Sequence, residues 1–136
     1  MDSKFSAKDF ILLLLNVDNQ KPIEGNLFIQ KEMFLIVEEV YPKLQEELEF
    51  IPYDYGPYSF KLVNILNNLN KDNLIYYENF EVNEYAITQK GEEYLNQIEF
   101  PKDIIKKVNK IKIGSNKLGY KGLLRYVYFT YPEYTI

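Results

Sequence analysis

Residues 53–74 read YDYGPYSFKLVNILNNLNKDNL, and this stretch decides the fold that the sequence predicts. The pair Gly56-Pro57 predicts a turn, and Pro57 suits the first position of a helix because its missing N–H costs nothing there. From Ser59 onward the apolar residues recur at helical spacing and form one stripe, made of Leu62, Ile65, Leu66 and Leu69. We therefore expect a short amphipathic helix that follows the turn and ends near Asn70.

The opposite face of this expected helix is polar and free of acid. It presents Lys61, Asn64, Asn68 and Lys71 at spacings of three and four, and no Asp or Glu occurs between Gly56 and Lys71 in a chain with 20 acidic residues. An Asn side chain can bond both N6 and N7 of adenine in the major groove, and Lys can donate to guanine or phosphate. We interpret the face as a candidate surface for double-stranded DNA; a solvent-facing polar strip is the other interpretation.

Length and composition indicate one folded domain of ordinary kind. With 136 residues, of which 46% are hydrophobic and 26% charged, the chain is long enough to bury a core. It contains no Cys and no His, which excludes disulfides, thiolate metal sites and the commonest general base. The longest apolar run, Phe10 to Leu15, is too short to span a bilayer. We expect a cytoplasmic protein that needs no metal, cofactor or membrane.

Basic charge is concentrated towards the C-terminus. The chain has a net charge of −4, yet residues 102–125 hold eight basic residues against one aspartate, so the remainder carries −11. Lys106, Lys107 and Lys110 share the outward face of a helical pattern, which favours contact with phosphates. Two other interpretations are a solvated helix face and pairing with the Glu-rich second helix, where each surface pair adds about 0–1 kcal/mol.

The expected elements follow the order helix, helix, helix, hairpin, helix. The helices are predicted at 6–15, at 26–48 with a break at Pro42, at 59–70 and at 88–97, and the two strands at 74–77 and 84–88. This succession is that of a winged helix, in which the helix before the hairpin enters the major groove. The hairpin itself should stay off a phosphate backbone because it carries Glu78, Glu81 and Glu84.

Two further helices are expected after Pro101, separated by a loop at residues 114–116. We therefore divide the chain into a winged-helix-like domain, residues 1–98, and a C-terminal helical extension, residues 99–136. The last helix is apolar nearly all the way round, which predicts that it packs on the domain or forms a homodimer interface. The fold class we expect is mainly α with a small β-hairpin, an α+β fold. Interfaces favour aromatic residues, and the candidate partner-binding residues are Tyr55, Tyr58, Tyr126 and Phe129.

Four short motifs resemble one known family. The stretch 28–34 (FIQKEMF) resembles the LQKLLYF-like signature of Panacea (SocA-type) antitoxin domains and related winged-helix proteins. Tyr55-Gly56-Pro57 resembles their Tyr-Gly-Pro turn, residues 88–91 (TQKG) resemble the Thr-x-x-Gly after the wing, and the tail 131–135 (YPEYT) is similar to the ending of some relatives. The resemblance implies a winged-helix-like fold and a role in regulation or toxin neutralisation rather than catalysis.

The sequence offers no assembled catalytic site, so we expect a binding protein and not an enzyme. Adjacent carboxylates such as Glu46 and Glu47 cannot face each other across a substrate, and the phosphate-loop and nucleophile-elbow motifs are both missing. We expect a DNA-binding transcriptional regulator that acts as a homodimer. The alternative is a protein-binding module of antitoxin type, which neutralises or delivers a partner such as a toxin without binding DNA.

Overall fold

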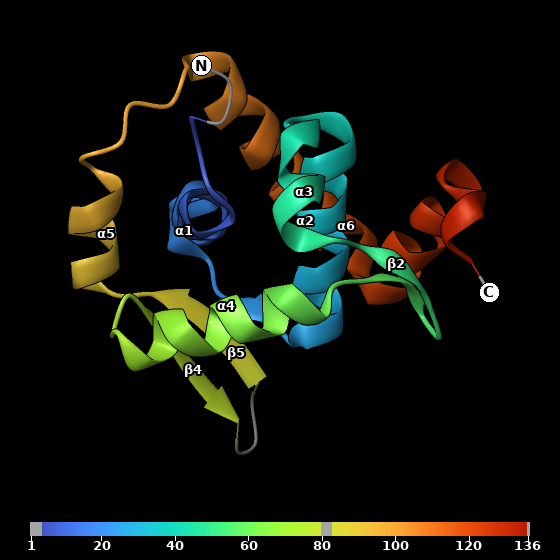
Figure 1. Cartoon of the computed structure of the whole chain (residues 1–136), viewed down its shortest axis with the longest axis horizontal. Helices are drawn as coiled ribbons and strands as arrows, with labels where there is room; N and C mark the ends of the chain where they lie inside the picture. The colour runs from blue at the N-terminus through green and yellow to red at the C-terminus, as the bar shows by residue number, and fades with distance from the viewer. Residues whose placement is uncertain (1–3, 80–82, 136) are drawn as a thin grey trace.

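The computed structural model describes residues 4–79 and 83–135, which form a mainly helical fold with two small antiparallel sheets. The expected α+β class is therefore confirmed. The main helices, shown in Figure 1, are α1 (Ala7–Gln20), α2 (Asn26–Glu39), α3 (Gln45–Leu48), α4 (Phe60–Lys71), α5 (Gln89–Leu95) and α6 (Lys102–Thr130). Two short 3-10 turns accompany them, η1 (Pro42–Leu44) before α3 and η2 (Pro132–Tyr134) after α6.

Helix α1 is the centre of the core. Ser6 begins it with a capping box, in which the Ser6 hydroxyl accepts from the Asp9 N–H at 3.2 Å and the Asp9 carboxylate accepts from the Ser6 N–H at 3.0 Å. Its apolar run 10–15 is fully or almost fully buried. Figure 1 looks down α1 and shows α4 below it and the first half of α6 above it. Helix α1 contacts both, and α4 and the first half of α6 lie on opposite sides of it in this view.

The expected hairpin is present and belongs to a three-stranded sheet. Strands β4 (Ile75–Asn79) and β5 (Asn83–Ile87) pair antiparallel, with Tyr77 opposite Tyr85 and their rings stacked at 4.6 Å. The short strand β1 (Ile23–Glu24), which the sequence did not reveal, pairs with β5 and gives the order β1-β5-β4. Glu81, predicted to lie in the wing, falls outside the described residues.

A second hairpin replaces the turn predicted at Gly56-Pro57. Strands β2 (Ile51–Tyr53) and β3 (Gly56–Tyr58) pair antiparallel with Pro52 opposite Pro57, so Pro57 is not the first residue of a helix. Helix α4 begins after Ser59, whose hydroxyl accepts from the Leu62 N–H at 2.9 Å. A sheet of only two strands tolerates proline because each strand keeps one edge outside the ladder.

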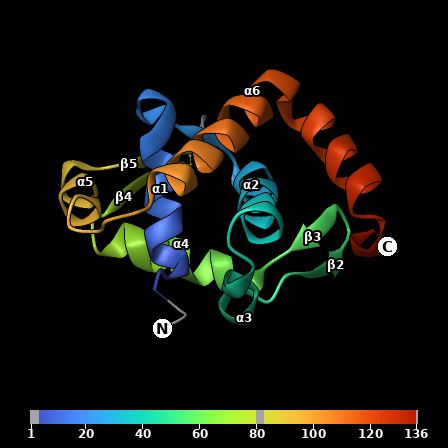
Figure 2. The same ribbon diagram turned by 90° about the horizontal axis from the view of Figure 1, so that it is seen from above.

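The C-terminal segment forms one long helix with an elbow and not two helices with a loop at 114–116. The helix continues through those residues because Ser115 is buried and packed, which overrides the local turn tendency of Gly-Ser-Asn. The break lies at Gly119, whose φ of 73° and ψ of 173° lie outside the helical region. Figure 2 shows the two halves of α6 meeting at an angle, with the second half beside β2 and β3.

Candidate functional site

The polar face of α4 is exposed, as the sequence predicted. Lys61, Asn64, Asn68 and Lys71 all lie on the surface, while Leu62, Leu66 and Leu69 on the other face are buried. However, the Lys61 ammonium lies 3.1 Å from the Glu49 carboxylate. The Glu49 carboxylate at the end of α3 therefore lies beside the polar face of α4, which has no acidic residue of its own.

The structure does not bring the two sets of predicted DNA-binding residues together. Lys106, Lys107 and Lys110 are exposed on the first half of α6, as predicted, but α1 lies between that half and α4 (Figures 1 and 2). A duplex seated on α4 would not contact these lysines in the same protomer. Within one protomer, the predicted contact of Lys106, Lys107 and Lys110 with phosphates would therefore lie on another side of the fold than the predicted contact of α4 with bases.

One lysine of the basic segment is part of the core. Lys112 is fully buried, and its ammonium donates hydrogen bonds to the carbonyls of Leu15 at 3.2 Å and Val17 at 2.9 Å, where the regular part of α1 ends. Burial lowers the pKa of Lys112 to about 8, and the nearby Glu32 opposes that shift. Its position one turn after Val108 on the apolar face is a signal that sequence reasoning missed.

Two adjacent residues of α2, Lys31 and Glu32, are both fully buried. Burial raises the pKa of Glu32 to about 8, and the Lys112 ammonium and the Ser115 hydroxyl counteract part of that rise. Lys31 faces the second hairpin: its Cε lies 3.7 Å from the position that a Cβ on Gly56 would take. Burial lowers the pKa of Lys31 to about 8, and among the described residues no hydrogen-bond acceptor reaches its ammonium.

Gln30, the residue before Lys31, fixes the connection between β3 and α4. Its side chain is buried, its amide donates to the Ser59 carbonyl at 2.9 Å, and its oxygen accepts from the Ser59 N–H at 2.8 Å. These two bonds satisfy a buried stretch of backbone that no strand or helix pairs. Gln30 and Lys31, within the stretch 28–34 that resembles the antitoxin signature, thus connect α2 to the second hairpin.

The second hairpin and the first residue of α4 present a group of large apolar side chains, which we call the hairpin cluster: Ile51, Tyr53, Tyr55, Tyr58 and Phe60. The rings of Tyr53, Tyr58 and Phe60 contact one another at centroid distances of 5.0–5.4 Å. Ile51, Tyr53, Tyr55 and Phe60 are 40–56% exposed, and the Tyr58 hydroxyl accepts a hydrogen bond from Asn26 at 2.8 Å. The predicted partner-binding residues Tyr55 and Tyr58 belong to this cluster, whereas Ile51, Tyr53 and Phe60 were missed despite the aromatic density of residues 53–60.

Two acidic side chains border the hairpin cluster. Asp54 lies at the hairpin tip between Tyr53 and Tyr55, and Glu49 lies 3.1 Å from the ammonium of Lys61, the residue after Phe60; both acids are exposed. Glu46 and Glu47 lie beside the start of α1 instead, where the Glu47 carboxylate accepts a hydrogen bond from the Ala7 N–H at 2.8 Å. The cluster therefore combines exposed aromatic surface with a negative border.

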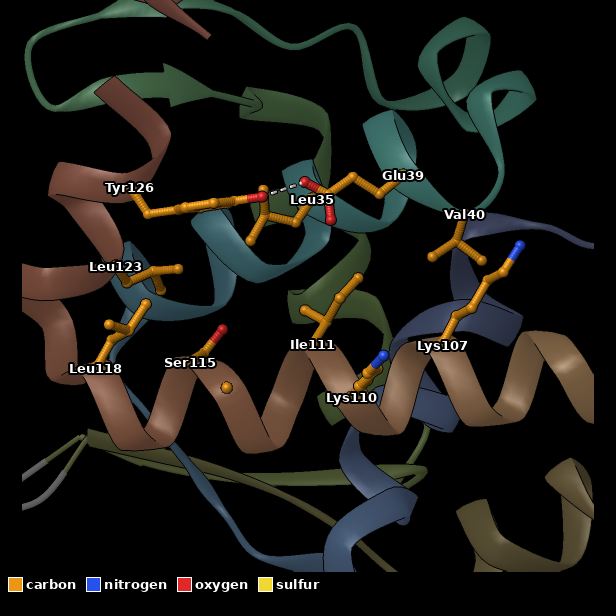
Figure 3. Close-up of a pocket in the computed structure, with 11 residues that line it drawn as sticks. Leu35, Glu39, Val40, Lys107, Lys110, Ile111, Ser115, Leu118, Leu123 and Tyr126 are labelled. Atoms are coloured by element: carbon orange, nitrogen blue, oxygen red, sulfur yellow. Dashed lines mark hydrogen bonds between the residues drawn. The ribbon is translucent and has the colours of Figure 1, made fainter. Parts of the chain in front are cut away.

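A pocket of about 410 Å³ lies between α2 and the inner side of the α6 elbow (Figure 3). It brings together three predicted site residues, Lys107, Lys110 and Tyr126, which the sequence had assigned to different surfaces. The Tyr126 hydroxyl donates to the Glu39 carboxylate at 2.9 Å, and this bond together with burial raises the pKa of Tyr126. The fourth predicted partner-binding residue, Phe129, is 82% exposed and is absent from the pocket lining.

No protein-family model and no curated protein matches the chain. Within residues 4–79 and 83–135, no group of three or more acidic side chains is placed to hold a metal ion. In the same part of the chain, every helix is too short or too polar to cross a bilayer.

Proposed function

We propose that this chain is a protein-binding regulatory module that recognises its partner through the hairpin cluster. The observation that carries the proposal is the exposure of four large apolar side chains, Ile51, Tyr53 and Tyr55 on the hairpin and Phe60 at the start of α4. Single exposed apolar residues are common on protein surfaces, but a contiguous group with tyrosines is typical of interfaces.

The border of the cluster defines the chemistry of the partner. The exposed carboxylates of Glu49 and Asp54 favour a partner segment that carries Lys or Arg beside apolar side chains. Arg is especially suited because its guanidinium can stack on Tyr53 or Phe60 while pairing with an acid. The resemblance to antitoxin domains supports the same class of function, in which the partner is a toxin or another delivered protein in the cytoplasm.

The proposal includes a winged-helix architecture. The strand order β1-β5-β4, with α4 directly before β4, supports it because a wing formed by two strands follows the third main helix. Residues 40–59, which contain α3 and the second hairpin, stand where a helix-turn-helix has a turn of 3–4 residues. The site we propose for the partner therefore lies in the segment that departs from the DNA-binding pattern.

Recognition of double-stranded DNA by a homodimer is the second candidate function. The exposed amides of Asn64 and Asn68 on α4 favour it. Duplex binding gains most of its affinity from phosphate contacts, yet the basic residues of α6 lie across the core from α4 and Lys61 is paired with Glu49. The charge distribution therefore supports a protein partner better than a duplex.

Co-expression with the products of the two flanking genes tests the proposal. We expect one product to co-purify with the chain, and we expect Tyr53→Ser/Phe60→Ser to abolish co-purification because both side chains are exposed parts of the cluster. Asn64→Ala/Asn68→Ala is the matched control and should retain the partner. Retention by the cluster variant together with loss by the Asn variant would overturn the proposal, and so would co-purification of neither product.

A duplex-binding assay separates the second candidate from the first. Fluorescence anisotropy with a DNA duplex from the region upstream of the chain's own gene should show no saturable binding at low salt if the chain binds a protein partner and not DNA. Saturable binding that weakens steeply with salt and is lost in Asn64→Ala/Asn68→Ala would show instead that the chain recognises DNA through α4.

A further inference from the structure

We propose that the pocket inside the α6 elbow binds a small organic acid, with an apolar body against the pocket wall and a carboxylate between Lys107 and Lys110. This site is separate from the hairpin cluster and its function does not depend on the proposed protein partner. Its volume of about 410 Å³ is within the range of about 300–1,000 Å³ that small-molecule sites occupy.

The wall of the pocket is built for an apolar body. Leu35 and Val40 come from the α2 side, Ile111 and Leu118 from the first half of α6, and Leu123 from its second half. Leu118 remains 52% exposed although its neighbours around the pocket are apolar. A ligand seated here would remove that surface from water, which provides a favourable free energy of about 25 cal/mol per Å² of apolar area.

The charges of the pocket select an anion. Lys107 and Lys110 are three residues apart on α6, so their side chains emerge on the same face, and among the described residues neither ammonium forms an ion pair. The one carboxylate in the lining, Glu39, is already held: it accepts from the Tyr126 hydroxyl at 2.9 Å and from the Tyr131 hydroxyl at 2.7 Å. Figure 3 shows Glu39 turned towards Tyr126, which leaves the two lysines to pair with the ligand.

The elbow gives the pocket its shape. Gly119, at a φ of 73°, joins the two halves of α6, which bring Leu118 and Leu123 together at one end of the pocket (Figure 3). Enclosure by α2 and by both halves of one helix favours a compact ligand over a long partner helix, which needs a groove along its whole length. A carboxylate with a linear or aromatic apolar body fits this combination of volume, wall and charge.

Titration calorimetry with three ligands of equal chain length tests the proposal: octanoate, octan-1-ol and octylammonium. We expect saturable binding of octanoate and at least about tenfold weaker binding of octylammonium, because only the head group differs. Lys107→Gln/Lys110→Gln should weaken octanoate about tenfold and leave octanol unchanged. Lys102→Gln/Lys106→Gln is the matched control, because it removes the same charge from the same helix outside the pocket lining.

Three results would overturn the proposal. The first is equal affinity for octanoate and octylammonium, and the second is equal affinity of wild type and Lys107→Gln/Lys110→Gln for octanoate. The third is a concentration-dependent dimer, measured by sedimentation, that Leu118→Glu disperses and octanoate does not, since a second copy of the chain would then occupy the site. Unchanged far-UV circular dichroism of each variant shows that a lost signal reflects the pocket and not the fold.

Discussion

The two hairpins of this chain have similar size but are held in place by different means. The β4–β5 hairpin is fixed by backbone: it pairs with β1, and the α-carbon of Gly91 packs against the Leu74 carbonyl so closely that a Cβ would lie 2.1 Å from that oxygen. The β2–β3 hairpin is fixed by side chains of α2 and α6, since Gln30 bonds both backbone groups of Ser59 and Gly56 packs against Tyr128 and Lys31.

This difference separates a structural hairpin from one that is available for binding. The β4–β5 hairpin directs Tyr85 into the core, whereas the β2–β3 hairpin directs Tyr53, Tyr55 and Ile51 into solvent. Because a few buried polar side chains hold β2–β3 in place, the outer face of this hairpin does not pack against the rest of the protein. Because one hairpin is held by backbone contacts and the other by buried side chains, substitutions at the two attachments should have different effects.

The largest effect is expected at the backbone anchor. Gly91→Ala would place a methyl group against the Leu74 carbonyl, which also accepts a hydrogen bond from the Thr88 N–H at 3.2 Å. The start of α5 would then have to move away from Leu74, which lies between α4 and β4. We expect a loss of about 3 kcal/mol or more in the free energy of unfolding, or failure to fold. Urea denaturation measures the loss, and Gly114→Ala, where nothing lies within 4 Å of the added methyl, is the control.

Gln30→Leu tests the side-chain anchor of the other hairpin. The substitution keeps the volume but leaves the buried N–H and carbonyl of Ser59 without partners, which should cost about 2–4 kcal/mol. Gln45→Leu removes the same two-bond pattern from Phe50 at a half-buried site, so water can replace the bonds and the loss should be smaller. Equal losses in the two variants would contradict the anchoring role of Gln30.

Lys31→Met should stabilise the protein at neutral pH, by about 2 kcal/mol, because it removes a buried ammonium whose pKa is lowered to about 8 by burial. Between pH 8 and the ordinary lysine value of 10.5, the unfolded chain holds a proton that the folded chain has lost, so wild-type stability rises with pH. The advantage of Met is therefore full below pH 8 and fades towards pH 10.5. Thermal melts across this range measure it, and an advantage that grows with pH would refute the assignment.

The smallest effect is expected at the exposed ion pair beside the cluster. Lys61→Ala removes a contact with Glu49 in which both side chains are more than half exposed, so the free energy of unfolding should change by less than about 1 kcal/mol. If the partner is basic, the same substitution should strengthen partner binding by leaving Glu49 free. Weakened binding would instead indicate that Lys61 contacts the partner directly, as expected if the partner is DNA or an acidic protein.

The sequence predicted those elements whose signals are local. The Ser6 cap, the start of α2 at Asn26, the break at Pro42 and the strands around Tyr77 and Tyr85 all depend on neighbouring residues, and the structure agrees with each. The polar face of α4 was likewise predicted as exposed, from spacing alone.

The rest depended on contacts between distant residues. Gly56-Pro57 was interpreted as a turn with Pro57 at the first position of a helix, whereas the β2–β3 hairpin depends on its packing against distant elements such as α2. Lys112 was counted with the surface lysines because its partners, the carbonyls of Leu15 and Val17, are almost one hundred residues away. A loop was expected at 114–116 and the break lies at Gly119 instead, because local composition does not show that Ser115 is buried and keeps residues 114–116 helical.

Hydrogen exchange of the full chain, alone and with the co-purifying gene product, locates the surface that the partner covers. If the hairpin cluster binds the partner, we expect slower exchange of the amides of residues 51–58 in the complex and unchanged exchange of those of 61–71 in α4. Protection confined to α4, with residues 51–58 exchanging as in the free protein, would contradict it.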